Sequence, residues 1–168
     1  MAEHPSAFTA VGRDVAVVIG AFLVLGVLSG VLWWLVVPPA QFTKLRSGGS
    51  MSEVELGKQF SADGFYVVIA AVVGVVTGLA LAWWRSRDPL LTSVLLVLGS
   101  ALAAALMAVT GHLLGPGPTG AALAAAKVGA KVPERLDVDT AVVYLTWPVA
   151  VLLGASVVLL GKSLDTDA

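Results

Sequence analysis

Four uncharged apolar runs constrain this chain more than any other feature. They extend over Val15–Val37, Phe65–Trp84, Leu90–Leu114 and Ala141–Gly161, and none contains Asp, Glu, Lys or Arg. A helix rises about 1.5 Å per residue, so it needs about 20 apolar residues to cross a hydrocarbon layer about 30 Å thick. The sequence therefore predicts an all-α, polytopic membrane protein with four transmembrane helices in one transmembrane domain, residues 15–161.

The connections between these runs predict the layout of the chain. Two long loops, 38–64 and 115–140, alternate with one short connection over 85–89. A connection this short joins antiparallel helices. We therefore expect two extracytoplasmic loops on one side of the membrane, with an N-terminal tail (1–14) and a C-terminal tail (162–168) on the other.

Local signals within the long loops predict further short elements. Ser52 and Glu55 have the S-x-x-E spacing of a capping box, which favours a short helix over about 53–60. Asp63 is expected to cap the second span. The alanine-rich stretch from Thr119 to Gly129 predicts a helix lying on the membrane surface.

The basic residues next to the spans predict the orientation. With the N-terminus inside, the cytoplasmic segments hold four basic residues near helix ends, where the positive-inside rule acts most strongly, namely Arg13, Arg85, Arg87 and Lys162. The raw count opposes this orientation, because the two long loops hold six basic residues. We give more weight to position and expect a multi-pass protein of the plasma (inner) membrane with both termini cytoplasmic.

Aromatic residues are consistent with the limits of the spans. Trp33, Trp34, Trp83 and Trp84 lie at the ends of the first two apolar runs. An amphipathic indole ring suits the headgroup layer, so we expect these four side chains at the membrane boundary.

Composition excludes several classes of function. Charged residues make up 12 % of the chain, against about 25 % in a typical soluble domain. The net charge of −1 gives no basic field for nucleic acid, and the absence of cysteine excludes disulfides and thiolate metal sites. The two histidines, His4 and His112, are too far apart to suggest a metal site. No catalytic motif is present, so we expect a protein that is not an enzyme and needs no cofactor.

The most specific motif is a set of small residues at a spacing of four. In lipid, helices associate through close backbone approach, which small side chains allow. The candidate packing residues are Gly26 and Gly30 in the first span and Ala70, Gly74, Gly78 and Ala82 in the second. Two interpretations stay open: these faces hold the four-helix bundle together, or one of them receives a helix of a partner. The two sets lie at similar depth, which predicts that the first and second helices pack on each other.

Three segments resemble a family of small actinobacterial four-helix membrane proteins of unknown domain function. They read VLWWLVVPP over 31–39, FSADGFYVV over 60–68 and DVDTAVVYLTWP over 137–148. The resemblance extends over nearly the whole chain. It implies an accessory subunit bound beside the permease subunits of an ATP-driven, Mce-type lipid importer, with no catalytic residues to carry over.

These observations lead to one principal hypothesis and two alternatives. The principal hypothesis is a non-catalytic accessory or stabilising subunit of a multi-subunit membrane complex, an Mce-type lipid (fatty acid) importer, which binds the permease through transmembrane helix packing and is surrounded by membrane lipids. The first alternative is a self-assembling small channel or carrier, which needs a polar stripe across an oligomer axis. The second is a membrane enzyme acting on lipid, which needs clustered acids or histidines near the bilayer.

Overall fold

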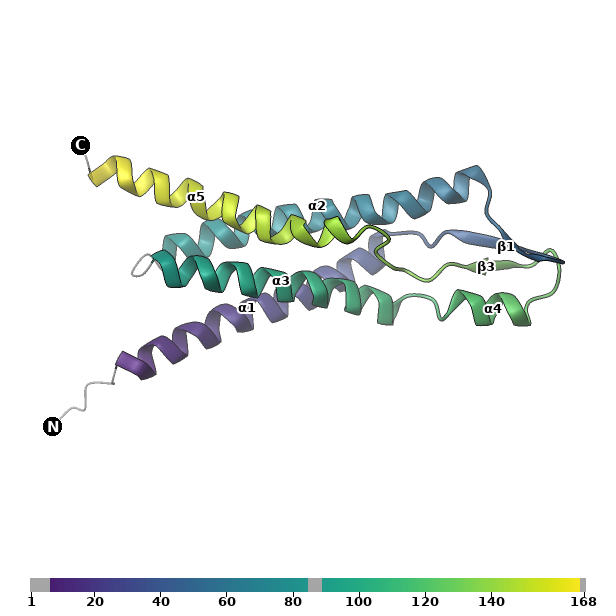
Figure 1. Ribbon diagram of the computed structural model, residues 1–168, viewed down its shortest axis with the longest axis horizontal. Helices are drawn as coiled ribbons and strands as arrows, with labels where there is room; N and C mark the ends of the chain where they lie inside the picture. The colour runs from purple at the N-terminus through teal and green to yellow at the C-terminus, as the bar shows by residue number, and fades with distance from the viewer. Residues whose placement is uncertain (1–6, 85–88, 167–168) are drawn as a thin grey trace.

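Four long helices form an elongated bundle with a small mixed domain at one end (Figure 1). The computed structural model describes residues 7–84 and 89–166. The long helices are α1 (Ala7–Val36), α2 (Glu53–Trp84), α3 (Pro89–Leu114) and α5 (Thr146–Thr166). Four helical segments are long and apolar enough to cross a membrane, which confirms the predicted all-α, four-helix class. The start of α1 and the end of α5 lie at the same end of the bundle (Figure 1).

Helices α1 and α5 extend beyond the apolar runs that predicted them, at the end of the bundle opposite the two long loops. Helix α1 begins at Ala7 and α5 continues to Thr166, so both helices extend into the expected tails 1–14 and 162–168, and the tails themselves stay a prediction. The length of an apolar run indicates where the hydrocarbon layer ends, whereas a helix continues until its backbone hydrogen bonding is interrupted. The short connection, with Arg85, Arg87 and the start of the expected 85–89 turn, lies outside the described residues. Helices α2 and α3 on either side of it run antiparallel, as predicted (Figure 1).

Helix α2 joins two elements that the sequence predicted separately. Ser52 is its N-cap, because the backbone N–H of Glu55 donates to Ser52 Oγ at 3.4 Å. The helix then runs without a break from Glu53 to Trp84, so the expected cap at Asp63 is wrong. Asp63 lies inside the helix, and its Oδ1 accepts from the backbone N–H of Asp139 at 3.3 Å. Glycine weakens a helix by about 1 kcal/mol without ending it, which explains why Gly64 does not stop α2.

The fourth span begins with a tighter turn than an α-helix. A 3₁₀ turn, η1 (Ala141–Leu145), leads directly into α5 at Thr146. Pro148 then falls in the first turn of α5, where a missing backbone N–H breaks no intrahelical hydrogen bond. The proline is therefore compatible with the start of this helix.

The two long loops fold together into one structure, which we call the cap (residues 38–62 and 115–140). Strands β1 (Gln41–Leu45), β2 (Gly48–Ser50) and β3 (Lys131–Pro133) form an antiparallel sheet in the order β2-β1-β3. Pairing of β1 with β3 joins the first loop to the second, with Phe42 opposite Val132. The sequence did not predict these strands.

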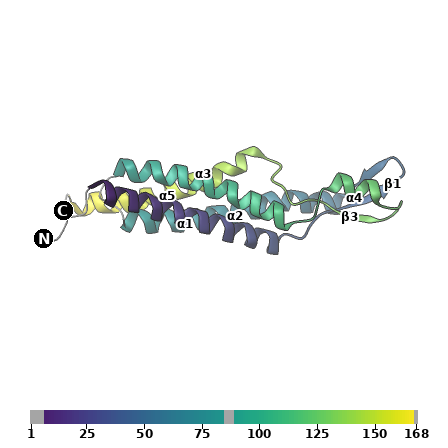
Figure 2. The same cartoon turned by 90° about the horizontal axis from the view of Figure 1, so that it is seen from below.

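Helix α4 (Thr119–Ala125) belongs to the cap and is shorter than expected. It lies beyond the end of α3, beside β1 and β3 (Figures 1 and 2), and its expected position on the membrane surface stays a prediction. A Cβ placed on Gly49 would lie 2.9 Å from Cδ1 of Leu123, so α4 packs directly on β2. This contact holds α4 against the sheet.

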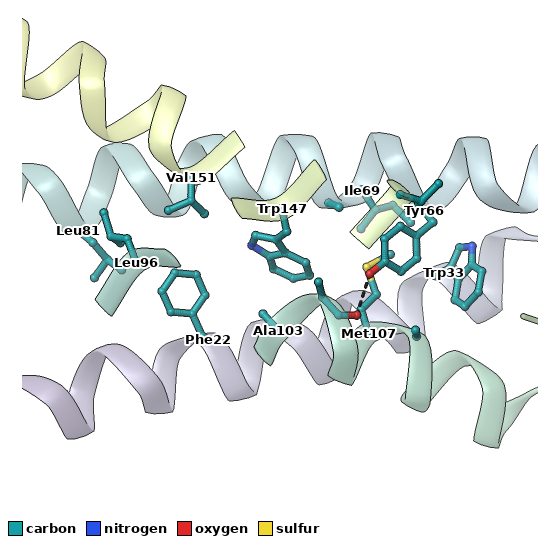
Figure 3. Packing of buried hydrophobic residues seen from close by; sticks show 14 of the residues in the cluster. Phe22, Trp33, Tyr66, Ile69, Leu81, Leu96, Ala103, Met107, Trp147 and Val151 are labelled. Carbon is teal, nitrogen blue, oxygen red and sulfur yellow. Dashed lines mark hydrogen bonds between the residues drawn. The ribbon is translucent and has the colours of Figure 1, made fainter. Parts of the chain in front are cut away.

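The long helices associate as two pairs, α1 with α3 and α2 with α5. Helices α2 and α3, although consecutive in the chain, make little contact. The largest fully buried side chains are aromatic and lie between the pairs (Figure 3): Phe22, Trp33, Tyr66 and Trp147. The bundle therefore has a core of its own in addition to its surface toward lipid.

Candidate functional site

The small-residue face of α2 packs against α5. Ala70, Gly74, Gly78 and Ala82 are all buried. A Cβ placed on Gly74 would lie 2.8 Å from Cβ of Ala150, and one on Gly78 would lie 3.0 Å from Cα of Val151. These separations are shorter than ordinary van der Waals contact, so glycine is required for the two backbones to approach this closely.

Helix α5 contributes a glycine to the same interface. A Cβ placed on Gly154 would lie 3.0 Å from the backbone nitrogen of Leu79. Glycines from both helices therefore meet across one interface. Residue numbers rise in the same direction along both helices, from Gly74 beside Trp147 to Leu79 beside Gly154, so α2 and α5 run parallel.

The small-residue face of α1 packs against α3 in a similar way. A Cβ placed on Gly26 would lie 2.9 Å from the carbonyl oxygen of Ala103, and one on Gly30 would lie 2.6 Å from that of Met107. The prediction that the first and second helices pack through these faces is wrong, because each face meets a different partner helix. Both candidate sets therefore serve helix packing inside this chain.

Two further glycines complete the α1–α3 interface and were not identified from sequence. A Cβ on Gly99 would lie 2.8 Å from Cε2 of Phe22, and one on Gly111 would lie 2.7 Å from Cζ3 of Trp33. Each stands four residues before another small residue, Gly99 before Ala103 and Gly111 before Gly115, so a search at a spacing of four extended to the third span would have found them. What distinguishes these two contacts is that an aromatic residue on one helix lies opposite a glycine on another.

Aromatic hydrogen bonds join the pairs near the cap. Trp33 Nε1 donates to the carbonyl oxygen of Ala62 at 2.9 Å, which ties α1 to α2. Tyr66 Oη donates to the carbonyl oxygen of Ala104 at 2.7 Å, which ties α2 to α3 (Figure 3). The two rings meet edge to face with centroids 5.4 Å apart.

The tryptophans at the helix ends differ in exposure. Trp33 is fully buried, so its expected position in the headgroup layer is wrong. Trp83 and Trp84 are 72 % and 77 % exposed at the opposite end of the bundle, as expected for boundary residues. The hydrogen bond from the indole N–H of Trp33 to the carbonyl oxygen of Ala62 accounts for the inward position of this side chain.

Three serine and threonine hydroxyls within the spans bond to their own helices. Thr77 Oγ1 donates to the carbonyl oxygen of Val73 at 2.6 Å, and Ser156 Oγ donates to that of Leu152 at 2.8 Å. Ser100, which is fully buried, donates to the carbonyl oxygen of Val97 at 3.0 Å. Such local bonds satisfy the hydroxyl in lipid without a water-filled path.

Charged groups gather in the cap, where they hold its segments together. Glu55 Oε2 accepts from the backbone N–H of Gln41 at 2.8 Å, and Glu55 Oε1 lies 2.8 Å from Lys58 Nζ. The hydrogen bond from Lys58 holds the pKa of Glu55 below its ordinary value. These contacts attach β1 to the start of α2.

A second cluster of polar side chains lies where the cap meets the bundle. Gln59 Nε2 donates to Glu134 Oε1 at 3.2 Å, and burial, with the nearby charge of Asp139, raises the pKa of Glu134. His112 Nδ1 lies 3.3 Å from the carbonyl oxygen of Leu136 and 3.5 Å from Asp137 Oδ2. Over residues 7–84 and 89–166, no group of three His, Cys, Asp or Glu side chains is arranged to hold a metal ion.

The surface of the bundle that faces outward is apolar on every long helix. Exposed stripes include Val68, Val72 and Val76 on α2 and Val24, Leu28 and Leu35 on α1. These stripes are the surfaces available to lipid or to another membrane protein.

Fold and surface together define a multi-pass α-helical membrane protein whose two long connections build one cap. No protein-family model, curated protein or solved structure matches the chain. The relationship to the actinobacterial family therefore stays a prediction.

Proposed function

We propose that this protein is a non-catalytic accessory or stabilising subunit of a multi-subunit membrane complex. The observation that carries the proposal is the bonding of serine and threonine hydroxyls within the spans to their own helices, as at Thr77, Ser100 and Ser156. A channel or carrier needs polar groups directed into a path through the membrane. Here the spans present apolar surface outward, which suits contact with lipid and with other transmembrane helices.

The partner in this proposal binds the exposed stripes of the long helices. The small-residue faces are occupied inside the bundle, since Gly74 and Gly78 meet α5 while Gly26 and Gly30 meet α3. A foreign helix would have to separate these pairs to reach them. The stripes centred on Val72 of α2 and Leu28 of α1 are accessible without any rearrangement.

The complex that we propose is an ATP-driven, Mce-type lipid importer of the plasma membrane. The support is the resemblance of the segments 31–39, 60–68 and 137–148 to the actinobacterial family that includes LucB, an accessory subunit of the mycobacterial Mce complex. Its partners would be the integral permease subunits, with no nucleic acid involved. In this proposal both termini are cytoplasmic and the cap is outside.

Affinity purification tests the subunit assignment. A tag after Ala168, gentle extraction of native membranes and quantification of the associated proteins should recover a permease–ATPase assembly at fixed stoichiometry. A photo-crosslinking residue at Val72 or at Leu28 should then identify which stripe contacts the permease. Recovery of the protein alone would contradict the proposal and would make ion or lipid flux in liposomes the next measurement.

The orientation can be tested separately, because the chain contains no cysteine. Val128→Cys in the cap, where Val128 is 61 % exposed, should react with a membrane-impermeant maleimide on intact cells. Ser163→Cys near the end of α5 should react only after the membrane is permeabilised. The reverse pattern would place both termini outside.

A further inference from the structure

A groove opens between α2 and α5 at the end of the bundle opposite the cap. The two helices touch where Gly154 meets Val75 and Leu79, and beyond this crossing they diverge (Figure 1). The walls of the groove come from both helices: Val76, Leu79, Ala80 and Trp83 on α2, and Val157, Val158, Gly161 and Lys162 on α5. Apart from Lys162, every side chain that lines it is apolar or aromatic.

The outer end of the groove carries a cation beside an indole ring. Lys162 Nζ donates to the carbonyl oxygen of Trp83 at 3.2 Å and lies 5.6 Å from the centroid of the Trp83 ring. Lys162 follows the last residue of the predicted span, so we expect both groups at the membrane boundary. Lysine and tryptophan at this depth are typical contacts of lipid headgroups.

We infer that this groove binds one acyl chain of an anionic glycerophospholipid from the surrounding leaflet, with the lipid phosphate at Lys162. From Val76 to Trp83 the groove follows seven residues of α2, about 10 Å at 1.5 Å per residue. Its apolar walls match a hydrocarbon chain, and the ammonium group of Lys162 complements a phosphate charge.

The width of the groove favours a lipid chain over a helix. The side chain of Lys162 reaches from α5 to the backbone of α2, so it spans the groove at its outer end. A helix is about 10 Å across with its side chains and does not fit between walls that one lysine bridges, whereas a single acyl chain does. The inference does not depend on the subunit proposal, because it concerns the protein in any bilayer.

Native mass spectrometry of the purified full chain tests the inference. Detergent-solubilised protein is mixed with phosphatidylglycerol or with phosphatidylcholine of the same chain length, and retained lipid is measured. We expect one preferentially retained phosphatidylglycerol. Gly161→Leu adds a side chain to the groove, since a Cβ there meets nothing within 4 Å, and should abolish this retention.

Two further variants separate the chain contact from the charge contact and from a general effect. Gly12→Leu is the matched control, because Gly12 on α1 also has nothing within 4 Å and lies outside the groove; it should retain lipid like the wild type. Lys162→Gln should keep a bound lipid and reduce the preference for phosphatidylglycerol over phosphatidylcholine by about fivefold, the effect of one basic residue near an anionic surface.

Two outcomes would overturn the inference. The first is equal phosphatidylglycerol retention by the wild type, Gly161→Leu and Gly12→Leu. The second is unchanged lipid retention by Gly161→Leu with loss of a co-purifying membrane protein, which would show that a partner helix occupies the groove. Circular dichroism and gel filtration of each variant would confirm that it is folded.

Discussion

Gly78→Ala should destabilise the bundle, because its new methyl group would meet backbone atoms of α5. The nearest atoms of Val151 include its carbonyl carbon at 2.9 Å and its Cα at 3.0 Å, whereas ordinary contact begins at 3.4 Å. The helices must therefore separate by at least about 0.5 Å at this point. Backbone atoms cannot rotate away as the end of a flexible side chain can, so α5 has to move as a body.

The magnitude follows from two opposing effects. Overpacking a well-packed contact costs about 1–3 kcal/mol, and a clash with backbone belongs at the upper end of this range. Replacing glycine by alanine inside a helix contributes about 1 kcal/mol in the opposite direction. We therefore expect Gly78→Ala to lower the free energy of unfolding by about 2 kcal/mol.

Gly64→Ala is the control for this prediction. Gly64 lies on the same helix, and a Cβ there meets nothing within 4 Å, so only the gain in helix propensity applies. Unfolding by dodecyl sulfate titration in mixed micelles, followed by tryptophan fluorescence, should therefore separate the two variants by about 3 kcal/mol. Equal unfolding curves for the two variants would refute the argument that α2 and α5 depend on glycine for their close approach.

Three other predictions concern the cap and its attachment to the bundle. Burial raises the pKa of Glu134 above its ordinary value of 4.5, so the folded protein binds the carboxyl proton more tightly than the unfolded chain does. The contribution of the protonated Glu134 to stability is therefore lost as the pH rises from 4.5 through the folded-state pKa. Glu134→Gln should therefore unfold at the same or higher denaturant concentration than the wild type at neutral pH; a clear loss of stability there would contradict this. The lowered pKa of Glu55 has the opposite sign: its contribution to stability is present above pH 4.5 and is lost as the pH falls through the folded-state pKa. The protection factor of the Gln41 amide, which corrects hydrogen exchange for its intrinsic pH dependence, should therefore fall on acidification in the wild type. In Glu55→Gln this loss of protection should be smaller, and an identical pH dependence of the protection factor would refute the role of the carboxylate. Trp33→Phe removes the hydrogen bond to Ala62 and keeps an aromatic ring against Tyr66, so the same micelle titration should show a loss of about 0.5–1.5 kcal/mol, with Trp84→Phe unchanged as the exposed control.

The four spans could be predicted from sequence because hydrocarbon thickness fixes the length of an uncharged apolar run. The start of α2 at Ser52 was also predictable, since the N-cap bond to Glu55 depends on residues three positions apart. Both signals are local, and each carries its own physical explanation.

The cap and the pairing of helices depend on contacts that no local pattern encodes. Strand β2 consists of Gly48, Gly49 and Ser50, which have low strand propensity, and it exists because β1 supplies its hydrogen bonds. Strand β3 pairs with β1 from the other loop. For the helices, a face of small residues indicates close approach to some other helix without specifying which one. The partner of Gly30 is set by the shape of α3 around Met107, which the sequence of α1 does not contain.

The pairing of α1 with α3 and of α2 with α5 sets the order in which the protein can assemble during translation. The insertion machinery releases spans in sequence, and neither neighbouring pair α1–α2 nor α2–α3 forms a main interface. Helix α1 therefore cannot form its main interface until α3 is inserted. Helix α2 cannot form its own until α5 is inserted, and Gly74 and Gly78 stay exposed until then. The sheet is also completed late, because β1 leaves the ribosome long before its partner β3 does. A ribosome that stalls after residue 140 would leave a membrane-inserted chain with a complete cap sequence and only one of its two helix pairs.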